Sequence, residues 1–460
     1  MRCLLQVRLQ TLLWCTGSAV MLLFLIQILI QVYSEDLYPH AELFNHEFNG
    51  NESIQDVEDI VVLWWTPFTG QKGEVRHCGT VKCFFTEDRR FNNHNLTKAL
   101  MFYGSKFDLI DLPLPRNGLI YDWALLHEES PKNTPALSHL EALELFNITA
   151  TFSRYSHFPL TLQYLKSADV LTDLKYFIPV ERKNELLSEL APVLYIHSDC
   201  STPLERDAYA MELMRYIPVD SYGKCIQNRN LPEHLADPME SMDSDEFFHF
   251  VARYKFTLSF ENAVCDDYIT EKLWRPLIVG SVPIYMGSPS IRDWLPNNNS
   301  AILAMDFRSP KELAQYLHVH NSDITKYNSF LKHKLGVEDE KITNKRLVDA
   351  LEVRKWGIDN DFDKGNFIEH FECFVCEQEH KKLKGERAII FETSKAHYNC
   401  PIPVSPLTGV ENKANWWVDQ WQMGKCEARV LRDYVGAGKT NYDYQEFYDQ
   451  LRHMLLNKLC

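Results

Sequence analysis

Residues 254–293 constrain the fold more than any other part of the sequence, because they contain the pattern of a strand, a helix and a second strand. An apolar strand (KFTLSFE) leads into a polar loop (NAVCDDY), and the following helix begins near Ile269 and ends at Gly280, before the strand SVPIYMG. Ligands of open α/β sheets bind beyond the carboxyl ends of the strands, so this polar loop is the expected binding region.

Strands and helices alternate elsewhere along the chain as well. Residues 60–65 (IVVLWW) form a continuous apolar run, which is typical of a strand covered on both faces and favours a parallel sheet. Helical spacing of apolar residues occurs in RDAYAMELMRYI, and SPKELAQYL begins with the capping pattern of Ser309, Pro310 and Glu312. Further strands are expected at residues 99–102, 123–126, 193–196, 256–260, 282–285 and 301–303. The sequence thus predicts an α/β fold.

The 460 residues exceed what one hydrophobic core usually accommodates, which is about 250 to 300 residues. We expect a first domain at residues 59–185, a second at 186–365 and an appended C-terminal region at 366–460. The boundary near residue 185 is drawn at the charged stretch ERKNELLSEL.

An apolar segment at residues 11–32 has roughly the 20 residues that a helix needs to cross a bilayer. Arg2 and Arg8 precede it and an acidic run follows, which predicts a cytosolic tail (1–10), a transmembrane signal anchor (11–33) and a lumenal stem (34–58). A cleaved signal peptide is the alternative, but the segment exceeds the usual apolar length of about 7 to 15 residues and lacks a clear cleavage site. We expect a single-pass type II protein of the Golgi or endoplasmic reticulum membrane, with its body in the lumen.

A lumenal body predicts glycans and disulfides. The sequence offers both, with 12 cysteines and with N-x-[ST] sequons at Asn51, Asn95, Asn147 and Asn298. The net charge of −15 argues against nucleic acid as a partner, since phosphate binding depends on Lys and Arg.

The C-terminal region contains a Cys-x-x-Cys sequence, Cys373 and Cys376. Alone, this pattern indicates zinc or a redox pair, but the lumen oxidises thiols and no second pair lies at zinc spacing. Cys78 and Cys83 lie close together after the first strand, and two nearby pairs can form two parallel bridges. We therefore expect Cys78 and Cys83 to bond Cys373 and Cys376, which would staple the C-terminal region to the first domain.

The start of the helix after the polar loop, Thr270-Glu271-Lys272, has the chemistry of a diphosphate site. Unpaired backbone N–H groups and the helix dipole favour an anion, and Lys272 adds a full positive charge. Phosphate would repel Glu271, which suits the ribose hydroxyls of a nucleotide better. The alternative is that both are ordinary residues on a solvated helix face.

The segment FENAVCDDYITEKLWRPLIVGSVPIYMG resembles the donor-binding signature of the α1,3-fucosyltransferases, glycosyltransferase family 10. The flanking segments HEESPKN, RDAYAMELMRYIPVDSYGKC and FECFVC look closest to the fucosyltransferase 10 and 11 branch, and the resemblance covers residues 59–380. It implies two Rossmann-like domains that face each other across a cleft (GT-B type), with GDP-fucose bound by the second domain. The implied donor contacts are Arg206, Asn262, Tyr268, Glu271 and Lys272.

The resemblance also implies a catalytic base in the segment WALLHEESPKN. Family members have E-S-P or E-P-P here, which aligns Glu129 with the residue taken to be catalytic, and Glu128 is an alternative by proximity. Such a carboxylate takes the proton of the acceptor hydroxyl, while Arg206 and Lys272 stabilise the GDP leaving group. Attack opposite to GDP inverts the anomeric centre, as the family does.

Asp-x-Asp triplets hold Mn²⁺ in many glycosyltransferases, and two occur here, Asp243-Ser244-Asp245 and Asp359-Asn360-Asp361. Both lie in polar, acidic stretches that no apolar strand precedes, which is typical of solvated loops. We expect no metal site and no cofactor beyond the donor substrate.

The acceptor is the open question in the sequence. Transfer of fucose in α1,3 linkage to N-acetylglucosamine of a glycan is the main expectation, although FSRYSHF, around Arg154 and His157, departs from the YR-x-D-S-D run of the Lewis-antigen enzymes. Protein O-fucosylation of Ser or Thr in folded lumenal domains is one alternative. The other, from a different class, is a catalytically silent lumenal binding protein.

Overall fold

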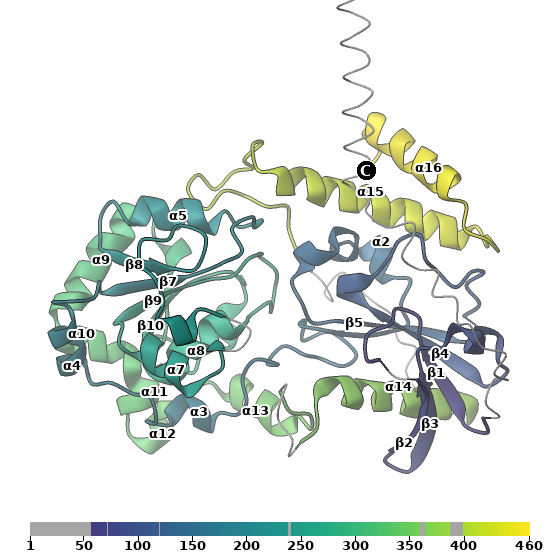
Figure 1. The fold of residues 1–460 in the computed structure, drawn as a ribbon, viewed down its shortest axis with the longest axis horizontal. Coiled ribbons are helices and arrows are strands. Elements are labelled where there is room, and N and C mark those ends of the chain that lie inside the picture. The colour runs from purple at the N-terminus through teal and green to yellow at the C-terminus, as the bar shows by residue number, and fades with distance from the viewer. Residues whose placement is uncertain (1–56, 71, 119, 238–240, 359–363, 387–398) are drawn as a thin grey trace, which may run out of the picture. The chain divides into compact units, whose positions relative to one another are not determined.

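The first half of the chain forms a six-stranded sheet in the computed structural model, which describes residues 57–70, 72–118, 120–237, 241–358, 364–386 and 399–460 (Figure 1). The order is β2-β3-β1-β4-β5-β6, and every neighbouring pair is parallel except the hairpin β2–β3. The strands are β1 (Ile60–Trp64), β2 (Glu74–Cys78), β3 (Val81–Thr86), β4 (Thr97–Tyr103), β5 (Asp122–His127) and β6 (Ile148–Thr151).

The second sheet has five parallel strands in the order β11-β10-β9-β7-β8. Its strands are β7 (Val193–Ile196), β8 (Val219–Tyr222), β9 (Phe256–Phe260), β10 (Val282–Met286) and β11 (Ile302–Leu303). The α/β fold with parallel sheets is therefore as predicted from the sequence.

The helices between and after these strands have the following bounds: α2 (Leu140–Leu143), α3 (Asp169–Thr172), α4 (Val180–Leu186), α5 (Arg206–Leu213), α7 (Asp245–Ala252), α8 (Glu271–Val279), α9 (Pro310–Ser322), α10 (Ile324–Asn328), α11 (Lys332–Leu335), α12 (Glu338–Lys341), α13 (Lys345–Val353), α14 (Phe367–Leu383), α15 (Trp416–Gly436) and α16 (Tyr444–Leu456). Short 3₁₀ turns connect several of them. One of these turns, Pro131–Asn133, follows β5 directly.

Both faces of the first sheet are covered, which explains the continuous apolar run of β1. Successive side chains of a strand point to opposite faces. Ile60, Val62 and Trp64 accordingly pack into one cluster with α14, while Leu63 packs into another with α15 and α16. Figure 1 shows α14 and α15 on opposite sides of the first sheet, so helices from the C-terminal region complete a core that begins at the first strand.

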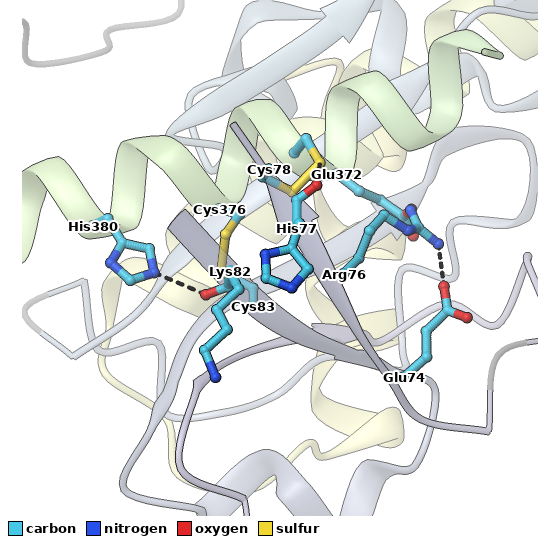
Figure 2. Close-up of a disulfide and its surroundings, with 10 residues drawn as sticks. Glu74, Arg76, His77, Cys78, Lys82, Cys83, Glu372, Cys376 and His380 are labelled. Atoms are coloured by element: carbon cyan, nitrogen blue, oxygen red, sulfur yellow. Dashed lines mark hydrogen bonds and ion pairs between the residues drawn. A yellow bond between two sulfur atoms is a disulfide. The ribbon is translucent and has the colours of Figure 1, made fainter. Parts of the chain in front are cut away.

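Two disulfides fix α14 to the first sheet. Cys78 pairs with Cys373 and Cys83 with Cys376, and the i, i+3 spacing brings both cysteines of the helix to the face that meets β2 and β3 (Figure 2). Glu372, the residue before Cys373, is buried, accepts a hydrogen bond of 2.7 Å from Nε1 of Trp64 and pairs with Arg76.

The second sheet is covered by α5 and α9 on one face and by α7 and α8 on the other. Helix α9 begins as predicted, with Oγ of Ser309 accepting from the N–H of Glu312 at 3.3 Å. The carboxylate of Glu312 accepts in turn from the N–H of Arg308 (3.0 Å) and not from the cap residue itself.

The helix expected to begin near Ile269 begins two residues later, because Thr270 is the N-cap of α8. It ends at Gly280, whose φ of +71° is the left-handed conformation that glycine adopts without strain. The expected strands correspond to β1, β4, β5, β7, β9, β10 and β11, whereas β2, β3, β6 and β8 were not predicted. The domain boundaries at 185 and 365 stay predictions; Asp56–Cys460 forms one compact unit.

The predicted tail (1–10), anchor (11–33) and most of the stem (34–58) lie outside the described residues, as does Asn51. Among the helices that are described, none combines the length and the apolar character required to span a membrane.

Candidate active site

A cavity of about 880 Å³ opens at the carboxyl edge of the second sheet. Residues after β7 and β8 and the first turns of α5 and α8 line it, which is the position expected for a ligand of an open α/β sheet. Three of the five predicted donor residues, Arg206, Glu271 and Lys272, belong to its lining. Residues far apart along the chain therefore meet at this cavity.

The first turn of α8 lines the cavity with Glu271 and Lys272, and Thr270 is the N-cap of this helix. Oγ1 of Thr270 accepts from the N–H of Lys272 (3.4 Å), and Nζ of Lys272 donates to Thr270 (3.1 Å) and to Oε1 of Glu271 (2.9 Å). Although burial disfavours the charged form, Lys272 and Arg275 lower the pKa of Glu271 to about 2. Glu271 is therefore an ionised hydrogen-bond acceptor beside a cation.

Arg206 is the first residue of α5 and is almost completely buried. Its guanidinium donates to the carbonyl oxygens of Asp199 (2.7 Å) and Phe260 (3.2 Å), while its Nε has no hydrogen-bond partner among the described residues. A buried charge is costly without compensation, so an anion in this cavity would be favourable.

Arg275 also lines the cavity, although the sequence reasoning did not single it out. It lies one helical turn after Glu271, and this i, i+4 spacing within α8 could have predicted that both side chains lie on the same helix face. In the described part of the chain, its Nε and Nη2 have no hydrogen-bond partner, and its guanidinium lies 5.1 Å from the Phe247 ring and 3.8 Å from Asp243. The cavity thus combines the positive charges of Arg206, Lys272 and Arg275.

The two candidate bases lie just after β5 and differ sharply in environment. Glu129 is exposed, and its Oε2 accepts from Nδ2 of Asn133 (3.1 Å). Glu128 is buried, and its Oε1 accepts from the hydroxyl of Tyr103 (3.2 Å). Only Glu129 is therefore presented to an incoming molecule.

Asn262 and Tyr268 do not line the 880 Å³ cavity. They face the first sheet instead: Oγ of Ser130 donates to Oδ1 of Asn262 at 2.8 Å, and the ring of Tyr268 packs 5.0 Å from that of Phe152. Burial raises the pKa of Tyr268 well above its ordinary value, so its hydroxyl is a neutral donor. Asn262 thus joins the loop after β9 to the loop that carries Glu129, and Tyr268 joins it to the segment after β6.

Tyr164 links the two halves of the site electrostatically. Its pKa is raised well above the ordinary value by burial, and then by Tyr268 and by the carboxylates of Glu271 and Glu129. The negative charges of Glu129 and Glu271 thus both contribute to the raised pKa of Tyr164.

Glu261, the acidic residue of the F-E-N signature, was also not singled out from the sequence. It is fully buried, and its carboxylate accepts from the N–H (2.8 Å) and from Oγ1 (2.7 Å) of Thr270. Burial raises its pKa to about 7. A side chain on Gly287 would approach its Cγ within 2.5 Å, so glycine leaves the room that this carboxylate occupies.

The remaining sites predicted from the sequence are the sequons and the two acidic triplets. The sequons at Asn95 and Asn298 are exposed, while Asn147 is half-buried and its Oδ1 accepts from the N–H of Trp123 (3.0 Å). In the triplet at 243–245, Asp245 accepts from Nζ of Lys175 (2.9 Å) at the start of α7. The triplet at 359–361 lies outside the described residues.

Two family models match this chain. "Glycosyltransferase family 10 (fucosyltransferase) C-term" matches residues 185–360, and "Fucosyltransferase, N-terminal" matches residues 57–165. Among solved structures, "Crystal Structure of alpha1,3-Fucosyltransferase with GDP-fucose" is 17% identical and covers 67% of this chain and 82% of its own, with a TM-score of 0.37 that is too low to support further argument.

Similar proteins include GDP-fucose protein O-fucosyltransferase 3 of Bos taurus, 46% identical over 91% of this chain and 88% of that protein. The Homo sapiens protein of the same name is 47% identical over 84% and 82%, respectively. These relatives show that the expected α1,3 transfer to N-acetylglucosamine is wrong. The donor signature specifies the nucleotide sugar but not the acceptor, and the acceptor-facing segment FSRYSHF was where the chain already departed from the glycan-modifying pattern. The chain belongs to glycosyltransferase family 10, the fucosyltransferases, and is a glycosyltransferase.

Proposed function

We propose that this protein transfers fucose from GDP-fucose to a Ser or Thr hydroxyl of a folded protein in the secretory lumen, with inversion at the anomeric carbon. One observation carries the proposal. Arg206, Glu271 and Lys272 line one cavity, and the loop that precedes α8 is hydrogen-bonded through Asn262 to Ser130, which follows the exposed Glu129 in the chain. The names of the relatives, protein O-fucosyltransferases, supply the class of acceptor.

The donor half follows from the charges of the cavity. Its volume of about 880 Å³ falls within the range of roughly 300 to 1,000 Å³ that is typical of ligand sites. The diphosphate accepts from Arg206, from Lys272 and from the N–H groups at the start of α8, and Arg275 adds a third positive charge. Glu271 accepts from the ribose hydroxyls, because its carboxylate is ionised.

The chemical step uses groups on both sides of the site. Glu129 removes the proton of the acceptor hydroxyl as the new bond to the anomeric carbon forms, and the bond to GDP breaks on the opposite face. The cations of the cavity stabilise the negative charge that develops on GDP. This arrangement requires two Rossmann-like domains that face each other across a cleft, and the contact of Ser130 with Asn262 supports it.

Three cations that reach the diphosphate make a metal unnecessary for donor binding. We expect full transfer activity after complete chelation of divalent ions. A loss that Mn²⁺ restores would contradict this expectation and would direct attention to the acidic triplets.

We place the enzyme in the Golgi or endoplasmic reticulum, with residues 11–33 as its anchor and its body in the lumen. The disulfides join Cys78–Cys373, Cys83–Cys376, Cys200–Cys225, Cys265–Cys400 and Cys426–Cys460. Such pairs persist in an oxidising compartment, which supports this location. The exposed sequons at Asn95 and Asn298 support it as well.

Product analysis by mass spectrometry tests the function. The enzyme is incubated with GDP-fucose and either small disulfide-rich domains or glycans that end in N-acetylglucosamine. We expect one deoxyhexose on a Ser or Thr of a folded domain and no modification of the same domain after reduction. Fucose on the glycans alone would overturn the proposal, and binding of the domains without any release of GDP would indicate a silent binding protein.

A further inference from the structure

A second cavity, of about 360 Å³, adjoins the loop of the candidate base. Pro131 and Lys132 line it from that loop, and Ala263 to Cys265 line it from the loop that follows Asn262. Its outer wall is a segment of the C-terminal region, residues 400–406, together with Trp417 and Trp421 of α15. We call residues 400–406 the C-terminal strap.

A disulfide joins the start of the strap to the loop that follows β9. Cys400 forms a disulfide with Cys265, and Nδ2 of Asn399 donates to the carboxylate of Asp266 at 2.7 Å. These two bonds fix the position of the C-terminal strap, and therefore of this wall of the cavity, relative to the loop that follows β9.

The lining of this cavity is apolar, unlike that of the donor cavity. Leu204, Val264, Leu303, Ile402, Trp417 and Trp421 are among its walls. Of the described residues that line it, three carry charge, and each is already paired: Lys132 with Asp199, and Arg292 with Asp306 at 2.6 Å. A nucleotide or a glycan carries many hydroxyls, and most of the walls offer them no hydrogen-bond partner, which is unfavourable for buried polar groups.

Apolar side chains are also exposed around the mouth. Met305 is 55% exposed and Val404 is 41% exposed, and both belong to the lining. Trp416, which is 50% exposed, packs against Trp417 with 4.3 Å between the ring centroids. Exposed apolar residues that gather at one place are typical of protein-binding surfaces.

We infer that this cavity is an acceptor subsite, which binds an apolar side chain of the polypeptide acceptor close to the hydroxyl that receives fucose. The inference rests on the proposed function, because it presupposes a polypeptide acceptor. The polar, negatively charged donor has its own cavity, which cations line, whereas the apolar cavity is lined by Pro131 and Lys132 of the loop that carries Glu129. The acceptor is therefore the reactant whose chemistry fits it.

Rim substitutions in the full chain test the subsite. The substrate is whichever disulfide-rich domain of the panel shows the highest turnover, and the variants are Met305→Asp and Val404→Asp. The control is Val319→Asp on α9, since Val319 is an exposed valine outside the cavity. We expect the KM for the acceptor domain to rise about ten-fold or more in the rim variants, relative to the KM for GDP-fucose, and not in the control.

A second measurement keeps the test independent of folding. Exposed apolar residues near the modified hydroxyl of the acceptor domain are changed to alanine, one at a time, and combined with Met305→Asp. If one of these acceptor residues occupies the subsite, its effect on the acceptor KM and that of Met305→Asp will not be additive. Equal acceptor KM values in the rim variants and the control, or a rise confined to glycan acceptors, would overturn the inference. Failure of the wild type to modify any domain would instead overturn the proposed function.

Discussion

Arg154 donates to both carboxylate oxygens of Asp267, through its backbone N–H (3.0 Å to Oδ2) and its Nε (2.8 Å to Oδ2 and 3.0 Å to Oδ1), and so joins the segment after β6 to the loop before α8. Asp267 is 1% exposed and has a φ of 64°, an unusual conformation for a residue with a side chain. Oγ of Ser290 (2.7 Å) and Nε1 of Trp294 (2.9 Å) complete its shell of donors. The loop next to Tyr268 is therefore shaped by a contact between the two halves of the enzyme.

Replacement of Arg154 by alanine removes the cation from this buried carboxylate. We expect the free energy of unfolding to fall by about 3 kcal/mol, because a buried charge that loses its partner is strongly destabilising. Urea denaturation measures the change. The control is Arg182→Ala, which removes an exposed pair with Glu185 on α4 and should cost less than about 1 kcal/mol. Equal losses in both variants would show that the Arg154 contact is no stronger than a surface pair.

The contact of Arg154 with Asp267 also shows which features of the site could be predicted from the sequence and which could not. The sequence could name Glu271, Lys272 and Arg206, which meet at one cavity, because the first two lie in one continuous motif and the same family pattern includes the third. The segment around Arg154 was recognised only as a departure from a known pattern. Its bond to Asp267 spans 113 positions of sequence, and no local spacing encodes such a contact.

Several parts of the fold were not predicted for a similar reason: no local sequence pattern marks them. Strands β2 and β8 are short and contain polar residues, so neither shows the apolar run that marked β1. The packing of α14 and α15 on the first sheet depends on side chains more than 300 positions away from β1. Glu261 was overlooked because its role lies in the hydrogen bonds to Thr270, which only the folded loop creates.

Glu129→Gln tests the assignment of the base. Glutamine keeps the shape of the side chain but cannot take the acceptor proton, so we expect kcat to fall by about 10² to 10⁴. Affinity for GDP-fucose, measured by calorimetry, should not change, since Glu129 does not line the donor cavity. Glu128→Gln is the matched control, because the neighbouring Glu128 is buried against Tyr103. A larger loss in Glu128→Gln than in Glu129→Gln would exchange their roles.

Lys272→Ala tests the donor cavity. A hydrogen bond to a charged group is worth about 1.5 to 3 kcal/mol, so the Kd for GDP-fucose should rise roughly ten-fold to one-hundred-fold. Affinity for the acceptor domain should change little, because this side chain bonds to Thr270 and Glu271 inside the cavity. Lys345→Ala on the exposed face of α13 controls for the loss of one positive charge. Equal weakening of donor and acceptor binding would count against the assignment of Lys272 to the donor.

Glu261 predicts a dependence of stability on pH. Burial raises its pKa from 4.5 to about 7, so the folded protein binds this proton more tightly than the unfolded chain does. Its contribution to stability is therefore fully present below pH 4.5 and is lost as pH rises toward 7. Glutamine retains an acceptor for the N–H of Thr270 and does not titrate. We expect the unfolding free energy of the wild type, relative to Glu261→Gln, to decrease across this interval in urea denaturation. Glu181→Gln removes the same charge from the exposed face of α4 and serves as the control. A difference between wild type and Glu261→Gln that stays constant with pH would show that Glu261 is ionised throughout, and that Lys272, 4.0 Å away, neutralises it.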